Sequence, residues 1–197
     1  MRKIISFMHV SLDGFVAGPN GEMDWIKVDD ELFDFGAQRI TKTDTALYGR
    51  VTFQMMESYW PTAADQPDAS KHDVEHAAWY KEVHKLVLST TLQESDWANT
   101  EVLNANWKER LQQLRQEEGT EILLFGSPSA THALLQENMI DGFWLFLNPV
   151  LLGEGIPLFK NIRDSLKLKL VSTHTFSIGA TELNYEVIRE ANLTQQK

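Results

Sequence analysis

The chain has 197 residues with a hydrophobic fraction of 43% and a charged fraction of 23%, values typical of one globular domain. It contains no cysteine, which excludes disulfides, cysteine-based zinc sites and a thiol nucleophile and makes the cytoplasm the expected compartment. The net charge of −10 argues against a nucleic-acid partner. The apolar N-terminal segment is too short for a signal peptide and no stretch reaches roughly 18 apolar residues, so we expect no membrane partner.

Hydrophobic periodicity predicts strands and helices in alternation along most of the chain. The expected strands are 3–10, 45–48, 85–89, 122–125, 142–147, 166–175 and 180–189. The expected helices are 29–42, 51–58, 70–82, 107–118 and 129–137. Ser70 is a predicted N-cap, and Gly119 is predicted to follow a helix end. Residues 60–70 contain two prolines and are expected to form a loop.

This pattern indicates an α/β fold of three layers, with a mostly parallel, twisted sheet and helices on both faces. The last two strands are expected to form an antiparallel pair at one edge. Residues 1–190 are expected to form one domain and residues 191–197 a C-terminal tail. Ligands of open α/β sheets bind outside the carboxyl ends of the strands, so the residues just after Tyr48, Leu88 and Phe125 are candidate site residues.

Each of these three strand ends is followed by glycine or by hydroxyl side chains. Gly49 would let a ligand approach the backbone closely, and Arg50 would add a forked donor for phosphate. Gly126 would leave room for a pyrophosphate beside the amides that open the next helix. Ser89 and Thr90 could bond phosphate oxygens or merely cap a turn. At the strand ends that lead to Gly49 and Gly126, the alternative is likewise an ordinary strand-to-helix turn.

Two further segments stand out. In 11–18, Asp13 is part of an Asp-Gly turn signal, and it is either a turn residue or a side chain over the reaction centre. Segment 148–159 contains two glycines and two prolines, which fix a rigid connection without indicating any chemistry by themselves.

Together the segments resemble the dihydrofolate reductase-like superfamily, in the branch of the riboflavin-biosynthesis reductase domain and its stand-alone relatives. That domain is the C-terminal part of a bifunctional deaminase-reductase. The resemblance extends from Lys3 to about Arg189, and its most specific stretch is Asn148-Pro149-x-Leu151-Leu152-Gly153-x-Gly155-x-Pro157-Leu158-Phe159. The other pieces, in family order, are Ser11-Leu12-Asp13-Gly14, Ala17-Gly18, Gly49-Arg50-x-Thr52, Lys85, Ser89-Thr90-Thr91-Leu92 and Gly126-Ser127.

The resemblance implies a dihydrofolate reductase-like fold and an NADPH-dependent oxidoreductase that transfers hydride to a small pyrimidine or pteridine heterocycle. The implied activity is similar to that of a 5-amino-6-(5-phosphoribosylamino)uracil reductase or a dihydrofolate reductase. The implied cofactor-binding residues are Val16, Ala17, Gly49, Arg50, Thr52, Ser89, Thr90, Gly126, Ser127 and Ser129. Val16 and Ala17 would flank the nicotinamide. The implied catalytic residues are Asp13, on the substrate side, and Asp30, near the acid that binds the pterin in dihydrofolate reductases; either one, or water, would supply a proton.

Three departures from the family pattern bear on function. Thr90 stands where many stand-alone relatives carry arginine, which removes a donor for the 2′-phosphate. The family often has Gly-Gly after the third of these strands, whereas here Pro128 follows Gly126-Ser127 and lacks an N–H for phosphate. The His-x-Glu and Pro-Cys-x-x-Cys signature of a zinc deaminase is absent, so this chain is not the deaminase.

Other functions are alternatives to a reductase. A non-catalytic NADP(H)- or ligand-binding protein with the same fold stays open. A conventional Rossmann dehydrogenase would need a Gly-x-Gly-x-x-Gly fingerprint that the chain lacks. His72, His76 and His84 are not completed by a carboxylate at a zinc-site spacing, and we expect no metal. His9 lies on the first strand and is expected to be a core histidine.

The expected partners are a small-molecule substrate and a second copy of the chain. The aromatic segment 143–146 suggests a homodimer through the sheet edge or the final strands. The alternative is that this segment is buried beneath the flanking helices.

Overall fold

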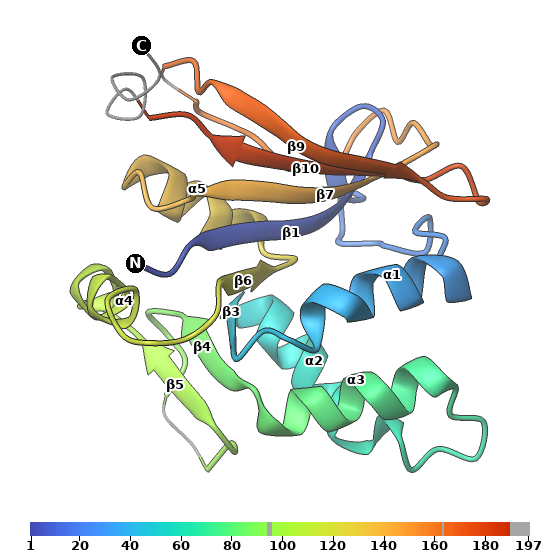
Figure 1. Cartoon of the computed structure of the whole chain (residues 1–197), viewed down its shortest axis with the longest axis horizontal. Helices are drawn as coiled ribbons and strands as arrows, with labels where there is room; N and C mark the ends of the chain where they lie inside the picture. The colour runs from blue at the N-terminus through green and yellow to red at the C-terminus, as the bar shows by residue number, and fades with distance from the viewer. Residues whose placement is uncertain (94–95, 163, 190–197) are drawn as a thin grey trace.

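The computed structural model describes residues 1–93, 96–162 and 164–189 and shows an eight-stranded sheet with helices on both faces (Figure 1). The tail predicted at 191–197 lies outside the described residues. The strands are β1 (Ile4–Ser11), β2 (Phe15–Ala17), β3 (Thr45–Gly49), β4 (His84–Leu88), β5 (Thr100–Leu103), β6 (Ile122–Phe125), β7 (Gly142–Asn148), β8 (Ile156–Pro157), β9 (Leu168–Thr175) and β10 (Thr181–Val187). The helices are α1 (Asp30–Ile40), α2 (Arg50–Ala63), α3 (Lys71–Glu82), α4 (Trp107–Leu114) and α5 (Pro128–Gln136).

The strand order in the large sheet is β5-β4-β3-β6-β1-β7-β10-β9. From β5 to β7 each strand is parallel to its neighbours, whereas β10 is antiparallel to β7 and β9 is antiparallel to β10. The predicted parallel sheet with an antiparallel C-terminal edge is therefore confirmed. Strands β2 and β8, which follow β1 and β7 in the chain, pair with each other as a separate short ribbon.

The buried side chains form two hydrophobic cores, one on each face of the sheet, because successive strand residues point to opposite faces. On β1, Ile4 and Met8 belong to the core that also contains residues of α4 and α5. Ile5 belongs to the other core, which contains residues of α1, α2 and α3. Helices α2 and α5 therefore lie on opposite faces of the sheet.

The loop predicted at 60–70 is partly wrong, because α2 continues through Pro61 to Ala63. Trp60 packs against His76 of α3, with ring centroids 4.0 Å apart, and Ala63 is buried. This packing outweighs the hydrogen bond that proline removes from the helix. The predicted N-cap at Ser70 is confirmed, since Ser70 and Asp73 accept hydrogen bonds from each other's backbone N–H groups in a capping box.

Two further differences concern element lengths. Helix α4 ends at Leu114 rather than at residue 118, and Arg115 beyond it donates to Asp141 Oδ2 at 2.6 Å and to the Arg2 carbonyl. These buried contacts hold the chain after α4 against Arg2 and Asp141, so the helix does not continue beyond Leu114. Strands β2, β5 and β8 have no counterpart in the prediction. The two or three residues of β8 and β2 are too few to show a period of two, and the four of β5 lack the continuous apolar run that marks β6.

The aromatic segment of β7 is buried, in agreement with the second of the two alternatives. Phe143, Trp144 and Phe146 are each at most 1% exposed. Every residue of β9, in contrast, is exposed at the edge of the sheet. Strand β9 therefore has an exposed edge, whereas the aromatic side chains of β7 are covered.

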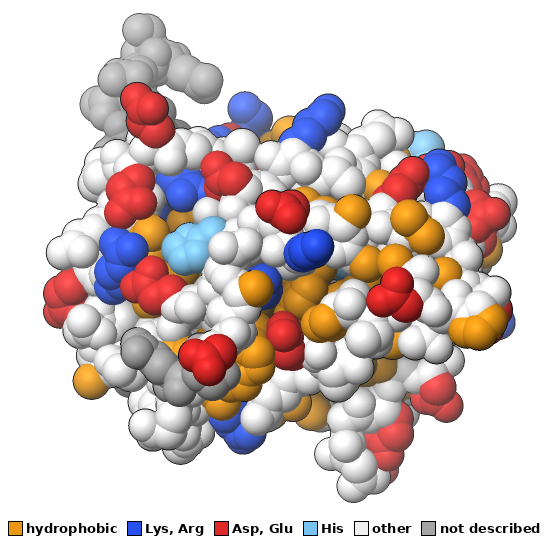
Figure 2. Space-filling view, turned by 90° about the horizontal axis from the view of Figure 1, so that it is seen from below, with side chains coloured by type: hydrophobic (Ala, Val, Ile, Leu, Met, Phe, Trp, Pro, Cys, Tyr) orange, Lys and Arg blue, Asp and Glu red, His pale blue; other side chains and the backbone are white. Residues whose placement is uncertain are grey.

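The charged side chains do not gather by sign on the face seen in Figure 2. Acidic and basic groups are interspersed there, with hydrophobic side chains visible between them. Within the described part of the chain, no helix is both long enough and apolar enough to cross a membrane.

Candidate functional site

The chain reverses its direction of winding between β3 and β6, which are adjacent and parallel. Strand β3 leads into α2 on one face of the sheet, and β6 leads into α5 on the other. Helices that diverge from neighbouring strands open a crevice at the carboxyl ends of those strands, and open α/β sheets bind ligands there. Two of the three predicted turns, those led by Gly49 and Gly126, lie at this point.

The residues of these two turns approach each other closely. A Cβ atom on Gly49 would lie 2.1 Å from Ser127 Oγ and 3.7 Å from Ser129 Oγ, so a side chain at position 49 would displace the Ser127 hydroxyl. Gly126 has a φ of +56°, and a Cβ there would lie 3.4 Å from Thr52 Cγ2. The structure therefore brings together five predicted cofactor-binding residues from separate segments. They are Gly49, Thr52, Gly126, Ser127 and Ser129.

Unpaired backbone donors face this crevice from α2. Gly49 is the N-cap of α2 and has no side chain, and the first turn of the helix contains no acidic residue. The first N–H groups of a helix attract anions, and here no side chain caps them. Arg50 is exposed on the same turn, where Nη1 donates to Gln54 Oε1 at 2.9 Å, and its other N–H groups have no partner among the described residues. This small region is suited to a phosphate although the protein is acidic overall.

The start of α5 offers fewer donors. Ser127 is its N-cap, and Ser127 Oγ accepts a long hydrogen bond of 3.4 Å from the Ala130 N–H. Pro128 at the first helical position has no N–H. The Oγ atoms of Ser127 and Ser129 lie 3.4 Å apart. At this turn, hydroxyl groups replace the backbone donors that a Gly-Gly sequence would supply.

The third predicted turn follows β4, the neighbour of β3. Ser89 is buried, and its Oγ accepts hydrogen bonds from the N–H groups of Thr91 and Leu92 at 3.2 and 2.9 Å. The hydroxyl thus has the turn-stabilising role that was the alternative interpretation, while its proton stays available for donation. Thr90 is exposed on the same edge.

On the other side of β1, Asp13 connects two loops. Its carboxylate accepts hydrogen bonds from the Ser11 hydroxyl at 2.6 Å, from the Gly153 N–H at 2.7 Å and from the Leu152 N–H at 3.1 Å. These donors hold the pKa of the Asp13 carboxyl below its usual range. An ionised carboxylate of this kind positions the segment after β7, and its low pKa does not suit proton donation at neutral pH.

The predicted nicotinamide residues lie on β2, next to the same segment. Val16 and Ala17 are buried, and Ala17 pairs with Ile156 of β8. A Cβ on Gly155 would lie 2.3 Å from the Ala17 carbonyl oxygen, so glycine is required for the two backbones to meet. Segment 148–159 therefore has a structural purpose that its sequence did not reveal, because it supports β2 beside the end of β1.

Two of the three acidic residues at the start of α1 bind the turn between β9 and β10. Asp29 caps the helix and accepts from the Ser177 hydroxyl, and Glu31 accepts from the Ser177 N–H, so both contact the turn between β9 and β10. Asp30 is exposed in the first helical turn and has no hydrogen bond within the described residues. The structure thus leaves Asp30 accessible but does not bring it into contact with Asp13.

His9 lies in the carboxyl half of β1, and its packing agrees with the interpretation of it as a core histidine. Its ring stacks on Phe146 with centroids 5.2 Å apart, and Asn148 Nδ2 lies 3.5 Å from His9 Nδ1. Burial lowers the pKa of His9 to about 4, so the imidazole is neutral at physiological pH. The side chain is only partly buried.

Of the three histidines between positions 72 and 84, two pack against aromatic rings, and His84 Nε2 lies 3.7 Å from Glu101 Oε2. His72 stacks on Phe33 with centroids 3.8 Å apart, and His76 packs against Trp60. Burial lowers the pKa of His76 to about 3. Within the described residues, no group of three or more His, Cys, Asp or Glu side chains could hold a metal ion.

The sheet order, the crevice and the interlocked loops define an α/β protein with a dihydrofolate reductase-like fold. Residues 2–181 match the RibD C-terminal domain, and the chain belongs to this family. It is 37% identical over 190 residues to the uncharacterized protein YyaP of Bacillus subtilis strain 168, covering 93% of this chain and 94% of YyaP.

Solved structures agree on the fold. One from Shewanella sp. PV-4, provisionally named a riboflavin biosynthesis protein, superposes with a TM-score of 0.70 at 23% identity, covering 95% of this chain and 99% of that one. The dihydrofolate reductase of Enterococcus faecalis, solved in complex with NADP(H), superposes with a TM-score of 0.63 at 15% identity, covering 95% and 97% of the two chains. The predicted family and fold class are confirmed.

Proposed function

We propose that this protein is an NADPH-dependent reductase that transfers hydride to a small heterocycle of pyrimidine or pteridine type. The observation that carries the proposal is the close approach of Gly49 and Ser127 where β3 and β6 diverge. A backbone cradle that a Cβ would fill, beside an uncapped helix N-terminus, suits the pyrophosphate of a dinucleotide. Membership of the RibD C-terminal domain family supports a reductase of the riboflavin-pathway type.

In this proposal, each part of the cofactor has its own set of residues. The α2 amides and Arg50 would bind phosphate, and Thr52, Gly126, Ser127 and Ser129 would surround the pyrophosphate and ribose. Ser89 and Thr90 would lie near the adenosine phosphate. Neither of them carries a positive charge, so we expect only a modest preference for NADPH over NADH.

The nicotinamide half would lie beside Val16 and Ala17. The bound cofactor supplies the hydride, and the chain must hold it next to an electrophilic carbon and exclude water. The hydrogen bonds from Leu152 and Gly153 to Asp13 fix the loops that would enclose the reaction centre. Asp13 is therefore proposed as a positioning residue on the substrate side.

The proton that accompanies the hydride needs a donor other than Asp13, because the pKa of that carboxyl is low. Asp30 is accessible and remains the proposed acidic group on the substrate side, directly or through water. The neutral ring of His9 is a second group in the carboxyl half of β1, and Asn148 Nδ2 lies 3.5 Å from its Nδ1. With the proton on Nε2, His9 would be a hydrogen-bond donor toward the substrate.

A cofactor titration tests the proposal directly. Arg50→Ala is expected to weaken NADPH binding by about 1–3 kcal/mol, the value of a charge-assisted hydrogen bond. Lys81→Ala, at an exposed position of α3, is the matched control and should leave the affinity unchanged. Equal affinity in both variants would contradict the cofactor placement. Tight binding without oxidation of NADPH across pyrimidines and pterins would instead favour a non-catalytic binding protein.

We also propose a homodimer that forms through β9. This strand is exposed along its whole length at the sheet edge, and Leu168, Leu170 and Val171 are exposed hydrophobic residues on it. Edge strands of this kind pair readily with another chain. Light scattering coupled to gel filtration would give the mass of the particle, and a monomer at micromolar concentration would contradict the proposal.

A further inference from the structure

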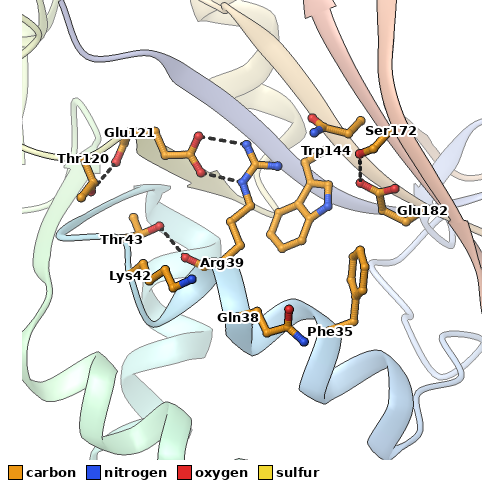
Figure 3. A pocket seen from close by; sticks show the side chains of 11 residues that line it. Phe35, Gln38, Arg39, Lys42, Thr43, Thr120, Glu121, Trp144, Ser172 and Glu182 are labelled. Carbon is orange, nitrogen blue, oxygen red and sulfur yellow. Dashed lines mark hydrogen bonds and ion pairs between the residues drawn. The ribbon is translucent and has the colours of Figure 1, made fainter.

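A cavity that shares no residue with the crevice lies on the face of the sheet that α1 covers. It has a volume of about 540 Å³ and lies between α1 and the face of β7, β10 and β9 (Figure 3). Thr43 and Glu121, which line one end of it, precede β3 and β6, so this end lies at the amino ends of those strands. The reductase proposal makes no use of this cavity.

Two aromatic rings and an ion pair form its walls. The rings are those of Trp144 from β7 and Phe35 from α1. The Arg39 guanidinium lies over the Trp144 ring, 4.7 Å from its centroid, and binds Glu121 through two hydrogen bonds of 2.6 and 2.9 Å. These contacts use Nε and Nη2, and among the described residues Nη1 has no hydrogen-bond partner.

A buried carboxylate lies at the other end. Glu182 of β10 is 2% exposed, and its Oε1 accepts only a long hydrogen bond of 3.4 Å from the Ser172 hydroxyl. Its Oε2 is buried and has no hydrogen-bond partner in the described part of the chain. Burial raises the pKa of Glu182, against the lowering effects of Ser172 and Trp144 as hydrogen-bond donors and of the charges of Arg39 and His174. A buried carboxylate oxygen without a partner, such as Oε2, is costly unless a cation or N–H donor binds it.

The remaining charge of the cavity is separated between its two ends. Arg39 and Glu121 neutralise each other, which leaves Glu182 at one end and Lys42 at the other. Lys42 is exposed and makes no ion pair with any described residue. Figure 3 shows Lys42 on the side of Glu121 and Thr120, and Glu182 beside Ser172, with the Trp144 ring between these ends in this view.

We propose that this cavity binds a small aromatic zwitterion, with its cationic nitrogen at Glu182, its carboxylate at Lys42 and its ring against Trp144 and Phe35. A cationic nitrogen would provide the partner that Glu182 lacks. A carboxylate would accept from Lys42 and from the unpaired Nη1 of Arg39. A ligand with one charge only would leave one end of the cavity unpaired, so the two charges together define the ligand class.

The probe for this proposal is 4-(aminomethyl)benzoate, which carries an ammonium group and a carboxylate at opposite ends of a ring. Isothermal titration should give saturable binding to the full chain, and benzoate and benzylamine should each bind at least about fivefold more weakly. Saturating NADPH should not displace the probe, because none of the residues proposed to hold the cofactor lines this cavity. Displacement by NADPH, or equal affinity for benzoate, would overturn the proposal.

Variants locate the probe within the protein. Glu182→Gln is expected to weaken its binding about tenfold or more, since a charge-assisted hydrogen bond is lost. Glu186→Gln is the matched control, because Glu186 is on the same strand but pairs with Lys3 at the surface. Lys42→Gln, at an exposed position, should weaken binding several-fold and decides the question even if Glu182→Gln does not fold. Wild-type affinity in Lys42→Gln would overturn the assignment.

Discussion

The two ends of the parallel strands differ in how they use polar groups. At the amino ends, Asp141 accepts from the Ile4 N–H, from Arg115 at 2.6 Å and from Arg189 at 2.5 Å, while Arg2 pairs with Asp44. At the carboxyl ends of β3 and β6, the uncapped α2 amides have no such partners. Polar groups that satisfy one another contribute to stability, whereas groups without protein partners are available to a ligand.

The largest expected effect tests the amino ends. Asp141→Asn would leave Arg115, whose side chain is 8% exposed, with a buried and unpaired charge. Loss of one partner of a buried ion pair costs about 3–5 kcal/mol of the free energy of unfolding. Urea denaturation measures this loss, and the folded variant should bind NADPH as the wild type does. A loss of NADPH affinity without a loss of stability would contradict the distinction between the two ends.

The next largest effect is expected at the carboxyl ends of β3 and β6. Gly49→Ala places a methyl group against Ser127, so we expect a loss of roughly 1–3 kcal/mol in stability from overpacking and at least about tenfold weaker NADPH binding. Adding Ser127→Gly should restore part of the stability, as expected for residues in contact. Gly36→Ala in α1, where a Cβ would lie an ordinary 3.9 Å from Ile40, is the control and should be neutral or slightly stabilising.

Asp13→Asn tests whether Asp13 positions the substrate side of the site or contributes to cofactor binding. An amide accepts hydrogen bonds from Leu152 and Gly153 more weakly than a carboxylate does. Turnover of a pyrimidine or pteridine substrate should therefore fall more than NADPH affinity does. Asp65→Asn, another exposed aspartate, should change neither quantity. If affinity falls and turnover does not, Asp13 belongs to the cofactor and not to the substrate side.

The smallest effect is a pH dependence of stability. The pKa of His9 is about 4 in the folded protein and about 6.5 when the chain is unfolded, so between these values only the unfolded chain binds the proton. The free energy of unfolding should therefore fall as the pH drops from 6.5 toward 4. In His9→Gln this slope should be shallower but not absent, because His76 contributes in the same direction. Denaturation at pH 7 and pH 5 measures the difference.

Much of the carboxyl end is predictable from the sequence, because its parts are short contiguous motifs. Gly49-Arg50 and Gly126-Ser127 each follow a recognisable strand, and parallel strands bring their ends to one edge. The sequence could not show that Asp13 binds the segment after β7, since the donors are backbone N–H groups 139 and 140 positions away. Hydrogen bonds to backbone N–H groups put no constraint on residue type and leave no motif.

The cavity between α1 and the sheet could not be predicted at all. Its lining includes Phe35, Trp144 and Glu182, which come from three separate elements. Each of these residues fits the hydrophobic pattern of its own helix or strand. Glu182 in particular alternates correctly on β10, so its burial becomes evident only when α1 is seen to cover that face of the sheet. A site with one residue from each element has no sequence signature, whereas a site built on turns does.

The position of β1 in the centre of the sheet also affects how the protein is made. Of the strands in this sheet it is synthesised first, yet its partners are β6 and β7, and Ile4 is aligned with Ile122. Pairings between such distant residues are slow to form because a long loop must close first. During synthesis the hydrogen-bonding groups of β1 therefore stay without their sheet partners until β6 has been made. The helix-rich stretch between β1 and β6 must stay soluble meanwhile, which sets a requirement on its surface that the folded protein alone does not explain.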